Sequence, residues 1–287
     1  MKTRIILVCL MLWNSIGLNA SRMSFGDAIS RKLIKYKVIS TFNGIRRMQL
    51  KVFNHSKDDI EVDLEPGRIF VSDKDYVQPF VVTRPVAIRL DKGEDRTLMV
   101  NAVCGNSRFA GPSEGNTFTE TKMIDLNARA VLNMMADEKI IDNQCYQSVV
   151  WHYTNKHNLA NLAYYKSQPG MKKIYDKVLA LENLSPTWYR LKYAPAASGD
   201  EMEFSGIPES VEGDLEFFNP SKENLQVQLT DKDGKLINTI EMMVDQPEGK
   251  QVIPIKLDLK AFKPGKYNIQ VVNESNTIIK NWEMDLS

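Results

Sequence analysis

Short runs in which apolar and polar residues alternate recur through residues 33–103, and they constrain the fold more than any other feature of the chain. Residues 48–52 and 60–64 show the alternation most clearly, and the second run stops at Pro66-Gly67. A period of two places one face of a strand against a core and the other against water. Short strands separated by turns about every ten residues indicate an antiparallel sandwich.

The periodicity changes after residue 104. Residues 106–121 are rich in Gly, Ser, Asn and Pro, which predicts a surface loop. From residue 124 onward the apolar spacing becomes helical, and Asn143 is placed to cap a second helix. We therefore expect helices within 123–182. Because no clear linker separates them from the strands, we expect a single β-sandwich unit with a helical segment over 21–185.

A second strand-rich unit follows residues 186–206, whose Pro, Ala, Ser and Gly content predicts a linker. Strand patterns return over 207–287, with a strong hairpin turn at 231–234 (Asp-Lys-Asp-Gly). About seven strands in about 85 residues are typical of an immunoglobulin-like sandwich. The predicted fold class is therefore mainly β with an α-helical segment, in two β-sandwich domains of which the C-terminal one is immunoglobulin-like.

Residues 1–20 predict a signal peptide. Lys2 and Arg4 precede an apolar run over 5–13, and the segment ends at Ala20, a small residue suited to cleavage. The run is shorter than the roughly 20 apolar residues of a membrane span, and no later stretch reaches that length. We expect an exported protein without a transmembrane segment, located in the periplasm, on the outer surface or outside the cell.

The chain is nearly neutral, with 37 Lys and Arg against 36 Asp and Glu. Loss of Lys2 and Arg4 with the signal peptide would change the formal net charge from +1 to −1. Such a balance offers no basic surface for phosphate contacts, so we expect no nucleic-acid partner. The sequence contains no phosphate loop, nucleophile elbow or paired-carboxylate signature, so we predict no catalytic residue and no cofactor.

The histidines do not predict a metal site. His152 and His157 are five residues apart and fall on different faces of a helix, and no acidic residue stands at a metal-motif spacing to them. The segment 231–234 begins like a calcium loop, but no Glu closes it at the twelfth position. We therefore interpret 231–234 as a hairpin turn and expect no metal.

Two cysteines, Cys104 and Cys145, remain after removal of the signal peptide, which contains Cys9. In an oxidising compartment such a pair favours one disulfide, here between the end of a strand and the start of a helix. Two separate buried thiols are a second possibility. A third possibility, in which Cys104 reacts with Gln147, follows from a resemblance to a known family.

Residues 147–155 (Gln-Ser-Val-Val-Trp-His-Tyr-Thr-Asn) resemble the Gln-x-Ala-Ile/Val-Trp-x-x-Thr-Asp stretch of thioester domains in Gram-positive surface adhesins. Residues 102–104 (Ala-Val-Cys), followed by a loop that contains proline, look like the cysteine-bearing strand end of that family. The resemblance implies an internal thioester between Cys104 and Gln147 that bonds covalently to a target amine. The order of sandwich, loop and helix also resembles uncharacterised secreted bacterial domains.

The C-terminal unit, over 215–285, resembles the type A C-terminal sorting domain of Bacteroidetes type IX secretion. The matching segments are 218–220 (Phe-Asn-Pro), 227–231 with 234–235 (Val-Gln-Leu-Thr-Asp and Gly-Lys), 257–259 (Leu-Asp-Leu) and 265–267 (Gly-Lys-Tyr). This resemblance implies an immunoglobulin-like fold and a Bacteroidetes origin. The chain lacks the basic terminal strand of a sorting signal.

Aromatic residues gather before the second unit, and Trp188, Tyr189 and Tyr193 are the candidates for a stacking platform. Packing between the domains is the competing interpretation. Trp151 and Asn155, on the helix after Asn143, are further possible binding residues. The leading hypothesis is a secreted or cell-surface, non-enzymatic interaction or adhesion module that binds an unknown protein or glycan through the loop 105–121 and this helix. The alternative is the thioester adhesin.

Overall fold

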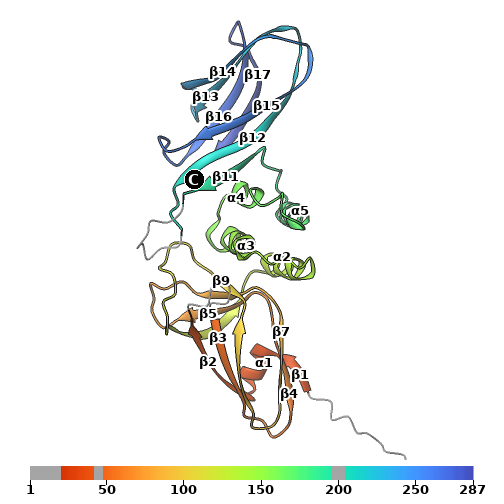
Figure 1. Cartoon of the computed structure of the whole chain (residues 1–287), viewed down its shortest axis with the longest axis vertical. Coiled ribbons are helices and arrows are strands. Elements are labelled where there is room, and N and C mark those ends of the chain that lie inside the picture. Colours follow the sequence, from red (N-terminus) through yellow and green to blue (C-terminus); the bar gives the residue numbers. More distant parts are fainter. Residues whose placement is uncertain (1–20, 42–47, 195–203, 287) are drawn as a thin grey trace, which may run out of the picture.

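The computed structural model describes residues 21–41, 48–194 and 204–286, so the predicted signal peptide lies outside the described residues. Figure 1 shows an elongated molecule in which an N-terminal sandwich, a layer of helices and a C-terminal sandwich follow one another. The prediction of a mainly β fold with a helical segment and sandwich domains is confirmed. None of the described helices combines the length and apolar composition that a membrane crossing requires.

The N-terminal sandwich consists of two sheets and one short helix. A seven-stranded sheet with the order β8-β3-β2-β10-β5-β6-β9 faces a three-stranded sheet with the order β1-β4-β7. Phe25, Phe70 and Phe80 are buried between them. Its elements are β1 (Ser21–Ser24), α1 (Phe25–Ser30), β2 (Ile34–Ser40), β3 (Met48–Asn54), β4 (Ile60–Leu64), β5 (Arg68–Ser72), β6 (Phe80–Val82), β7 (Val86–Leu90), β8 (Asp95–Val100), β9 (Ala102–Cys104) and β10 (Thr117–Met123).

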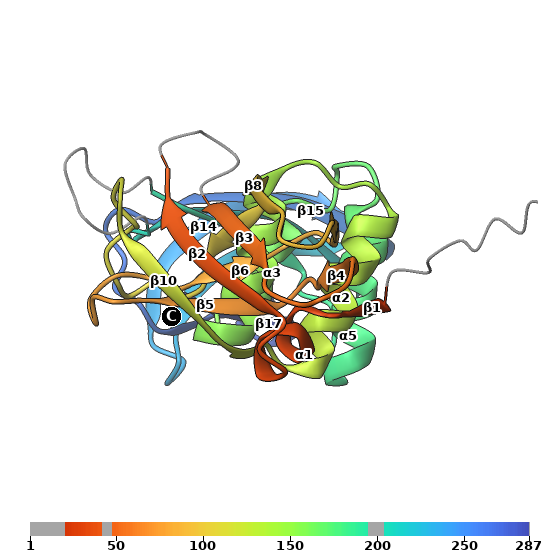
Figure 2. The same cartoon turned by 90° about the horizontal axis from the view of Figure 1, so that it is seen from below.

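Strand β10 corrects the last part of the surface loop predicted over 106–121, because residues 117–121 belong to the strand while 106–116 lie between β9 and β10. It pairs antiparallel with both β2 and β5 and lies inside the seven-stranded sheet, as Figure 2 shows from below. Phe118 is its one deeply buried side chain, and polar residues occupy most of the other positions. Because β10 contains so few apolar residues, it lacks the alternation that marks the other strands. Its strand conformation depends on pairing with β2 and β5.

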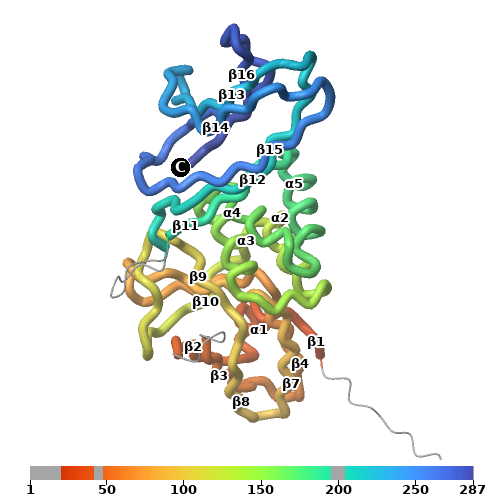
Figure 3. The backbone as a smooth tube through the Cα atoms, turned by 45° about the horizontal axis from the view of Figure 1, so that its top comes forward, coloured from red at the N-terminus to blue at the C-terminus, as the bar shows by residue number. Residues whose placement is uncertain are grey.

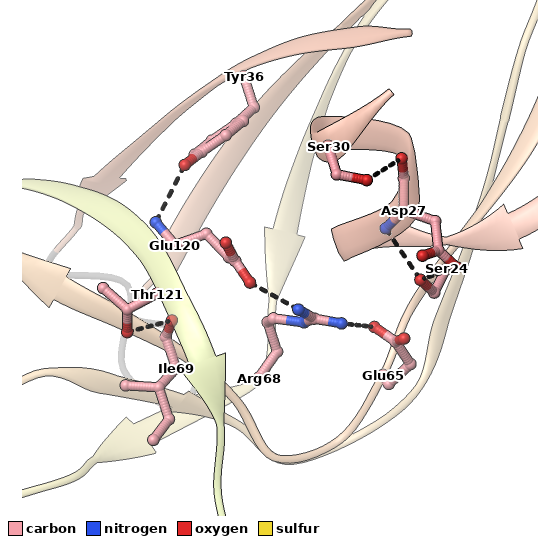
Figure 4. A network of polar contacts seen from close by, with 9 residues as sticks. All are labelled: Ser24, Asp27, Ser30, Tyr36, Glu65, Arg68, Ile69, Glu120 and Thr121. Carbon is pink, nitrogen blue, oxygen red and sulfur yellow. Dashed lines mark hydrogen bonds and ion pairs between the residues drawn. The ribbon is translucent and has the colours of Figure 1, made fainter. Parts of the chain in front are cut away.

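A buried ionic network joins three parts of this sandwich (Figure 4). Arg68, at the start of β5, donates to Glu65 at 2.9 Å and to Glu120 of β10 at 2.5 Å. The backbone N–H of Glu120 donates to the hydroxyl of Tyr36 on β2. A Cβ at Gly26 would lie 2.7 Å from the Arg68 guanidinium, so a glycine lets α1 lie close to this network.

Four helices follow the large sheet along the chain: α2 (Leu126–Asp137), α3 (Asn143–Asn155), α4 (Leu159–Ala163) and α5 (Met171–Glu182). Helices α2 and α3 lie next to the sheet, and α4 and α5 pack on their far side (Figure 1). Their apolar faces share one core with Ile69, Val81 and Val103 of the sheet. All four helices lie within the predicted range 123–182. The residue that caps α3 is Asp142 rather than Asn143, because its carboxylate accepts the N–H of Gln144 at 2.8 Å.

The C-terminal unit is a sandwich of a three-stranded sheet, β11-β12-β15, and a four-stranded sheet, β14-β13-β16-β17. Strand β11 lies inside the range 186–206 that was expected to be a linker, and it pairs with β12. Part of that range, 195–203, lies outside the described residues. The strands are β11 (Tyr189–Tyr193), β12 (Pro208–Asn219), β13 (Glu223–Asp231), β14 (Leu236–Gln246), β15 (Gly249–Asp258), β16 (Lys266–Asn273) and β17 (Ile278–Asp285).

The helical layer lies between the two sandwiches and contacts both of them (Figure 3). Ala160 of α4 is fully buried in the core of the C-terminal sandwich. Asn158 donates to the carbonyl of Asp285 at 2.7 Å, and the hydroxyl of Tyr189 donates to the same carbonyl at 3.0 Å. These contacts hold the end of β17 against the start of α4 and against β11.

Candidate functional site

Three of the predicted site residues lie on one face of α3. Gln147, Trp151 and Asn155 are spaced four residues apart, which places them one above another along a helix. This face lies against β9 and the segment that follows it, because both Gln147 and Asn155 form hydrogen bonds there. The structure therefore brings the row on α3 together with Cys104.

Gln147 binds the main chain of Cys104 with both atoms of its carboxamide. Its Oε1 accepts the N–H of Cys104 at 3.0 Å, and its Nε2 donates to the carbonyl of Cys104 at 2.5 Å. Cys104 is fully buried at the end of β9. The carboxamide and the cysteine that the thioester hypothesis joins are thus direct neighbours.

Cys145 is buried like Cys104, but its neighbours are different. Its Sγ donates to Oε1 of Gln168 at 3.1 Å, and no disulfide joins it to Cys104. Burial, and secondly the nearby carboxylate of Asp142, raise the pKa of Cys145 to about 12. The thiol is therefore protonated at neutral pH and is a poor nucleophile for disulfide exchange.

Asn155 holds the loop that follows β9. Its Oδ1 accepts the N–H of Ser107 at 3.1 Å, and its Nδ2 donates to Oδ1 of Asn106 at 2.9 Å. Nε2 of His157 lies 2.8 Å from the hydroxyl of the buried Ser107. The polar atoms of Asn155 are therefore occupied within the protein, and its role in the structure is to position residues 106 and 107.

Trp151 and Tyr193 belong to an aromatic cluster at the junction of the two units, together with His157 and Phe204. The ring of Phe204 lies 5.3 Å from Trp151, 4.3 Å from His157 and 4.8 Å from Tyr193. Burial lowers the pKa of His157 to about 4. This cluster could not be predicted from local patterns, since Phe204 and His157 come together only when the second unit docks.

A groove of about 830 Å³ lies between the helical layer and the C-terminal sandwich, and it contains Trp188 and Tyr189. The predicted aromatic stretch is therefore divided, because Tyr193 lies in the cluster and the other two lie in the groove. The lining residues are Ala163, Lys166, Ser167, Lys172, Thr187, Trp188, Tyr189, Arg190, Glu212, Gly213, Asp214, Glu216, Pro254, Ile255, Lys256 and Trp282.

Trp188 is held in a fixed orientation in the groove. Its indole N–H donates to the carbonyl of Glu283 at 2.8 Å, and its ring packs against Tyr189 with centroids 5.1 Å apart. A Cβ at Gly213 would lie 2.5 Å from the carbonyl oxygen of Trp188. Only glycine at position 213 therefore allows β12 to pass so close to the tryptophan.

Charged side chains surround the tryptophan. Glu212 accepts a salt bridge from Arg190 at 2.9 Å and another from Lys256 at 3.0 Å. Hydrogen bonds from Lys256 and Arg190 lower the pKa of Glu212, which is therefore ionised at neutral pH. These groups lie near solvent, so they contribute little to stability and are accessible to a ligand.

The groove offers groups for non-covalent binding, and Gln147 and Cys104 supply the carboxamide and the thiol that an acyl transfer would use. Among the described residues no three His, Cys, Asp or Glu side chains form a group that could hold a metal ion.

Comparison with known proteins identifies no family. No family model matches the chain, and no curated protein matches it. Among solved structures, β-glucosidase 3B from Thermotoga neapolitana in complex with glucose is 16% identical with a TM-score of 0.21, over 36% of this chain and 16% of that one. A β-glucosidase from Kluyveromyces marxianus is 11% identical with a TM-score of 0.22, over 84% of this chain and 44% of that one. The chain thus spans less than half of either enzyme, and likeness at this level supports no conclusion about its fold or activity.

Proposed function

We propose that this chain is an exported, non-enzymatic bacterial interaction or adhesion module that holds a protein or glycan partner in the groove between its two units. The observation that carries the proposal is the side chain of Trp188, half-buried and fixed by its hydrogen bond to Glu283, among charged residues from both units. Binding sites occur preferentially at such junctions between domains. The export and the bacterial origin rest on the sequence.

The proposal places the partner in the groove, whereas the sequence led us to expect it on the loop 105–121 and the helix after Asn143. Asn155 and Trp151 on that helix are engaged in internal contacts, and part of the loop forms β10. By contrast, the groove contains exposed polar groups next to an aromatic ring. That combination supplies both contact area and directional hydrogen bonds.

The test compares the wild-type protein with Trp188→Ala and with Tyr76→Ala as the matched control. Tyr76 is an exposed aromatic residue of the N-terminal sandwich and does not line the groove. Each protein is applied to an array of defined oligosaccharides and to an array of synthetic peptides. We expect wild type and Tyr76→Ala to bind the same probes and Trp188→Ala to lose them. Absence of wild-type binding on both arrays, or binding unchanged by Trp188→Ala, would overturn the proposal.

A second function, that of a thioester adhesin, is supported by the contact between Gln147 and Cys104. Attack of the Cys104 thiolate on Cδ of Gln147 would form a C–S bond, break the C–N bond and release ammonia. A target amine would then attack the thioester, form an amide and return the thiol. Both residues are shielded, Cys104 completely, and exclusion of water would protect such an acyl bond from hydrolysis.

A further inference from the structure

We infer that the groove takes an uncharged saccharide, stacked on the ring of Trp188. This inference rests on the proposed function and names the ligand class of the same site. It follows from three properties of the groove: the way the aromatic ring is fixed, the pairing of the charges around it, and the absence of a strand edge that a peptide could use.

Trp188 offers its ring face rather than its N–H to a ligand, because the N–H is already bonded to Glu283. Tyr189 is 6% exposed and packs against the indole, so it supports the ring. Trp282 also lines the groove. A rigid aromatic face loses little entropy on binding and provides a large apolar surface. The C–H face of a pyranose ring is flat and apolar and is suited to such a surface.

The polar groups beside the ring are arranged as donor and acceptor pairs. Glu212 forms salt bridges with both Arg190 and Lys256. Asp214, two residues further along β12, is exposed. A hydroxyl both donates and accepts a hydrogen bond, so a single sugar hydroxyl can bridge a carboxylate and a neighbouring cation. A ligand rich in hydroxyls satisfies such pairs without separating the ions.

The charges of the groove nearly cancel. Four cations and three anions line it, and several of them are already paired. Lys172 is bonded to Asp176, Glu216 to Lys250, and Glu212 to two cations. A charged ligand would have to compete with these existing pairs, whereas an uncharged ligand does not. The balance therefore favours a neutral saccharide over an acidic one.

A peptide in extended conformation lacks a strand with which to pair. Strand β12 is bonded to a neighbour on each side, and the outer side of β11 is covered by α4. The other edge strand of this sheet, β15, carries Pro254 in the groove, and proline has no N–H to donate. Strand β17, an edge of the four-stranded sheet, borders the groove through Trp282, but its carbonyl at Glu283 is already bonded to the indole of Trp188. Recognition by strand addition, a common mode for peptides, is therefore disfavoured.

The experiment is isothermal titration calorimetry of the full mature chain with maltohexaose, cellohexaose and chitohexaose as neutral probes. Hexagalacturonate is the acidic probe, and synthetic peptides are a separate set. We expect at least one neutral probe to bind, with an affinity that changes less than about twofold between 0.05 and 0.5 M salt. Trp188→Ala should weaken this binding about tenfold and Asp214→Asn about threefold, while Tyr76→Ala should leave it unchanged.

The outcomes separate the inference from the proposed function. If peptides or hexagalacturonate bind in a manner that depends on Trp188 and no neutral probe does, the saccharide inference is overturned and the proposed function stands. If a neutral probe binds equally well to Trp188→Ala, the saccharide does not occupy this groove and the inference fails. Thermal melting of each variant shows whether it is folded, and Asp214→Asn, an exposed substitution, tests the groove even if Trp188→Ala does not fold.

Discussion

The carboxamide of Gln147 pairs with the main chain of Cys104 as the edge of a neighbouring strand would, donating to its carbonyl and accepting its N–H. The contact joins helix α3 to the end of β9 across 43 positions of the sequence. It satisfies backbone groups that would otherwise be unpaired inside the protein. It also places the two reactants of a possible thioester side by side, which leads to a direct measurement.

Intact mass of the mature protein distinguishes the possible states of Cys104. A thioester with Gln147 lowers the mass by about 17 Da, the mass of ammonia, and methylamine adds to the acyl group. A disulfide between Cys104 and Cys145 lowers it by about 2 Da and is reversed by a reductant. Cys104→Ala should abolish either loss, whereas Cys145→Ala should abolish only the second. If the mature protein shows no loss of mass and both of its thiols titrate, the thioester and the disulfide are both contradicted.

Asn155→Ala should destabilise the protein by about 1–3 kcal/mol, because it leaves the N–H of Ser107 without its acceptor and removes one of the two hydrogen bonds that Oδ1 of Asn106 accepts. Urea unfolding followed by circular dichroism measures the change. Asn133→Ala is the matched control, since Asn133 is exposed on α2, and we expect its effect to be within about 0.5 kcal/mol. Equal effects of the two substitutions would show that the bonds of Asn155 do not stabilise the loop.

Arg68→Ala should destabilise the protein by about 3–5 kcal/mol, because it leaves the carboxylates of Glu65 and Glu120 without their cation in a buried site. Arg22→Ala, which breaks an exposed pair with Asp63, should cost much less stability than Arg68→Ala, because water screens the exposed pair. Denaturant titration at neutral pH gives both values.

Replacing the whole Arg68 network with Arg68→Met, Glu65→Gln and Glu120→Gln should restore part of the stability that Arg68→Ala removes. The triple variant leaves no charge uncompensated in the site. If it is no more stable than Arg68→Ala, then burial of unpaired carboxylates is not the cause of the loss.

Stability should fall below pH 6.5 because of His157. Its pKa is about 4 in the folded protein, while an unfolded histidine titrates near its ordinary value of 6.5. As the pH falls, the unfolded chain binds a proton first, so the contribution is present above about pH 6.5 and is lost by about pH 4. We expect His157 to contribute about 3 kcal/mol to the loss between these limits.

Urea unfolding near pH 7 and near pH 4.5 tests the role of His157. His157→Gln should reduce the difference in stability between the two pH values, whatever its effect at neutral pH. His55→Gln, at an exposed position, should retain the wild-type difference. If His157→Gln and wild type show the same dependence on pH, the buried imidazole is not responsible.

Local sequence patterns predicted the strands and helices wherever one face of an element is apolar. Residues 48–52 and 60–64 alternate and form β3 and β4, and the helical spacing after residue 124 corresponds to α2. Strand β10 was missed because Phe118 is its main apolar anchor. Strand β11 was missed because its aromatic residues lie next to a segment rich in Pro and Ala.

The candidate site could be predicted residue by residue but not as an arrangement. Gln147 and Cys104 were paired from a resemblance, and the structure places them in contact. Trp188 was predicted to form one aromatic platform with Tyr193. In the structure Trp188 lines the groove, whereas Tyr193, at the other end of β11, packs against Phe204 in the aromatic cluster. The partners that complete the groove, such as Glu212 and Lys256, belong to distant strands and carried no signal in the sequence.

Periodicities of 2 and 3.6 residues are local properties that specify which face of each element is buried, so the class of fold could be predicted from them. Which groups remain available to a ligand became clear only from the packing of the whole chain. The side chain of Asn155 is hydrogen-bonded to Ser107 and Asn106, whereas the ring of Trp188 lines the groove beside Glu212. The physical reason is that hydrogen bonds and ion pairs form between residues far apart in the chain, and their partners are chosen only when the two sandwiches and the helices pack together.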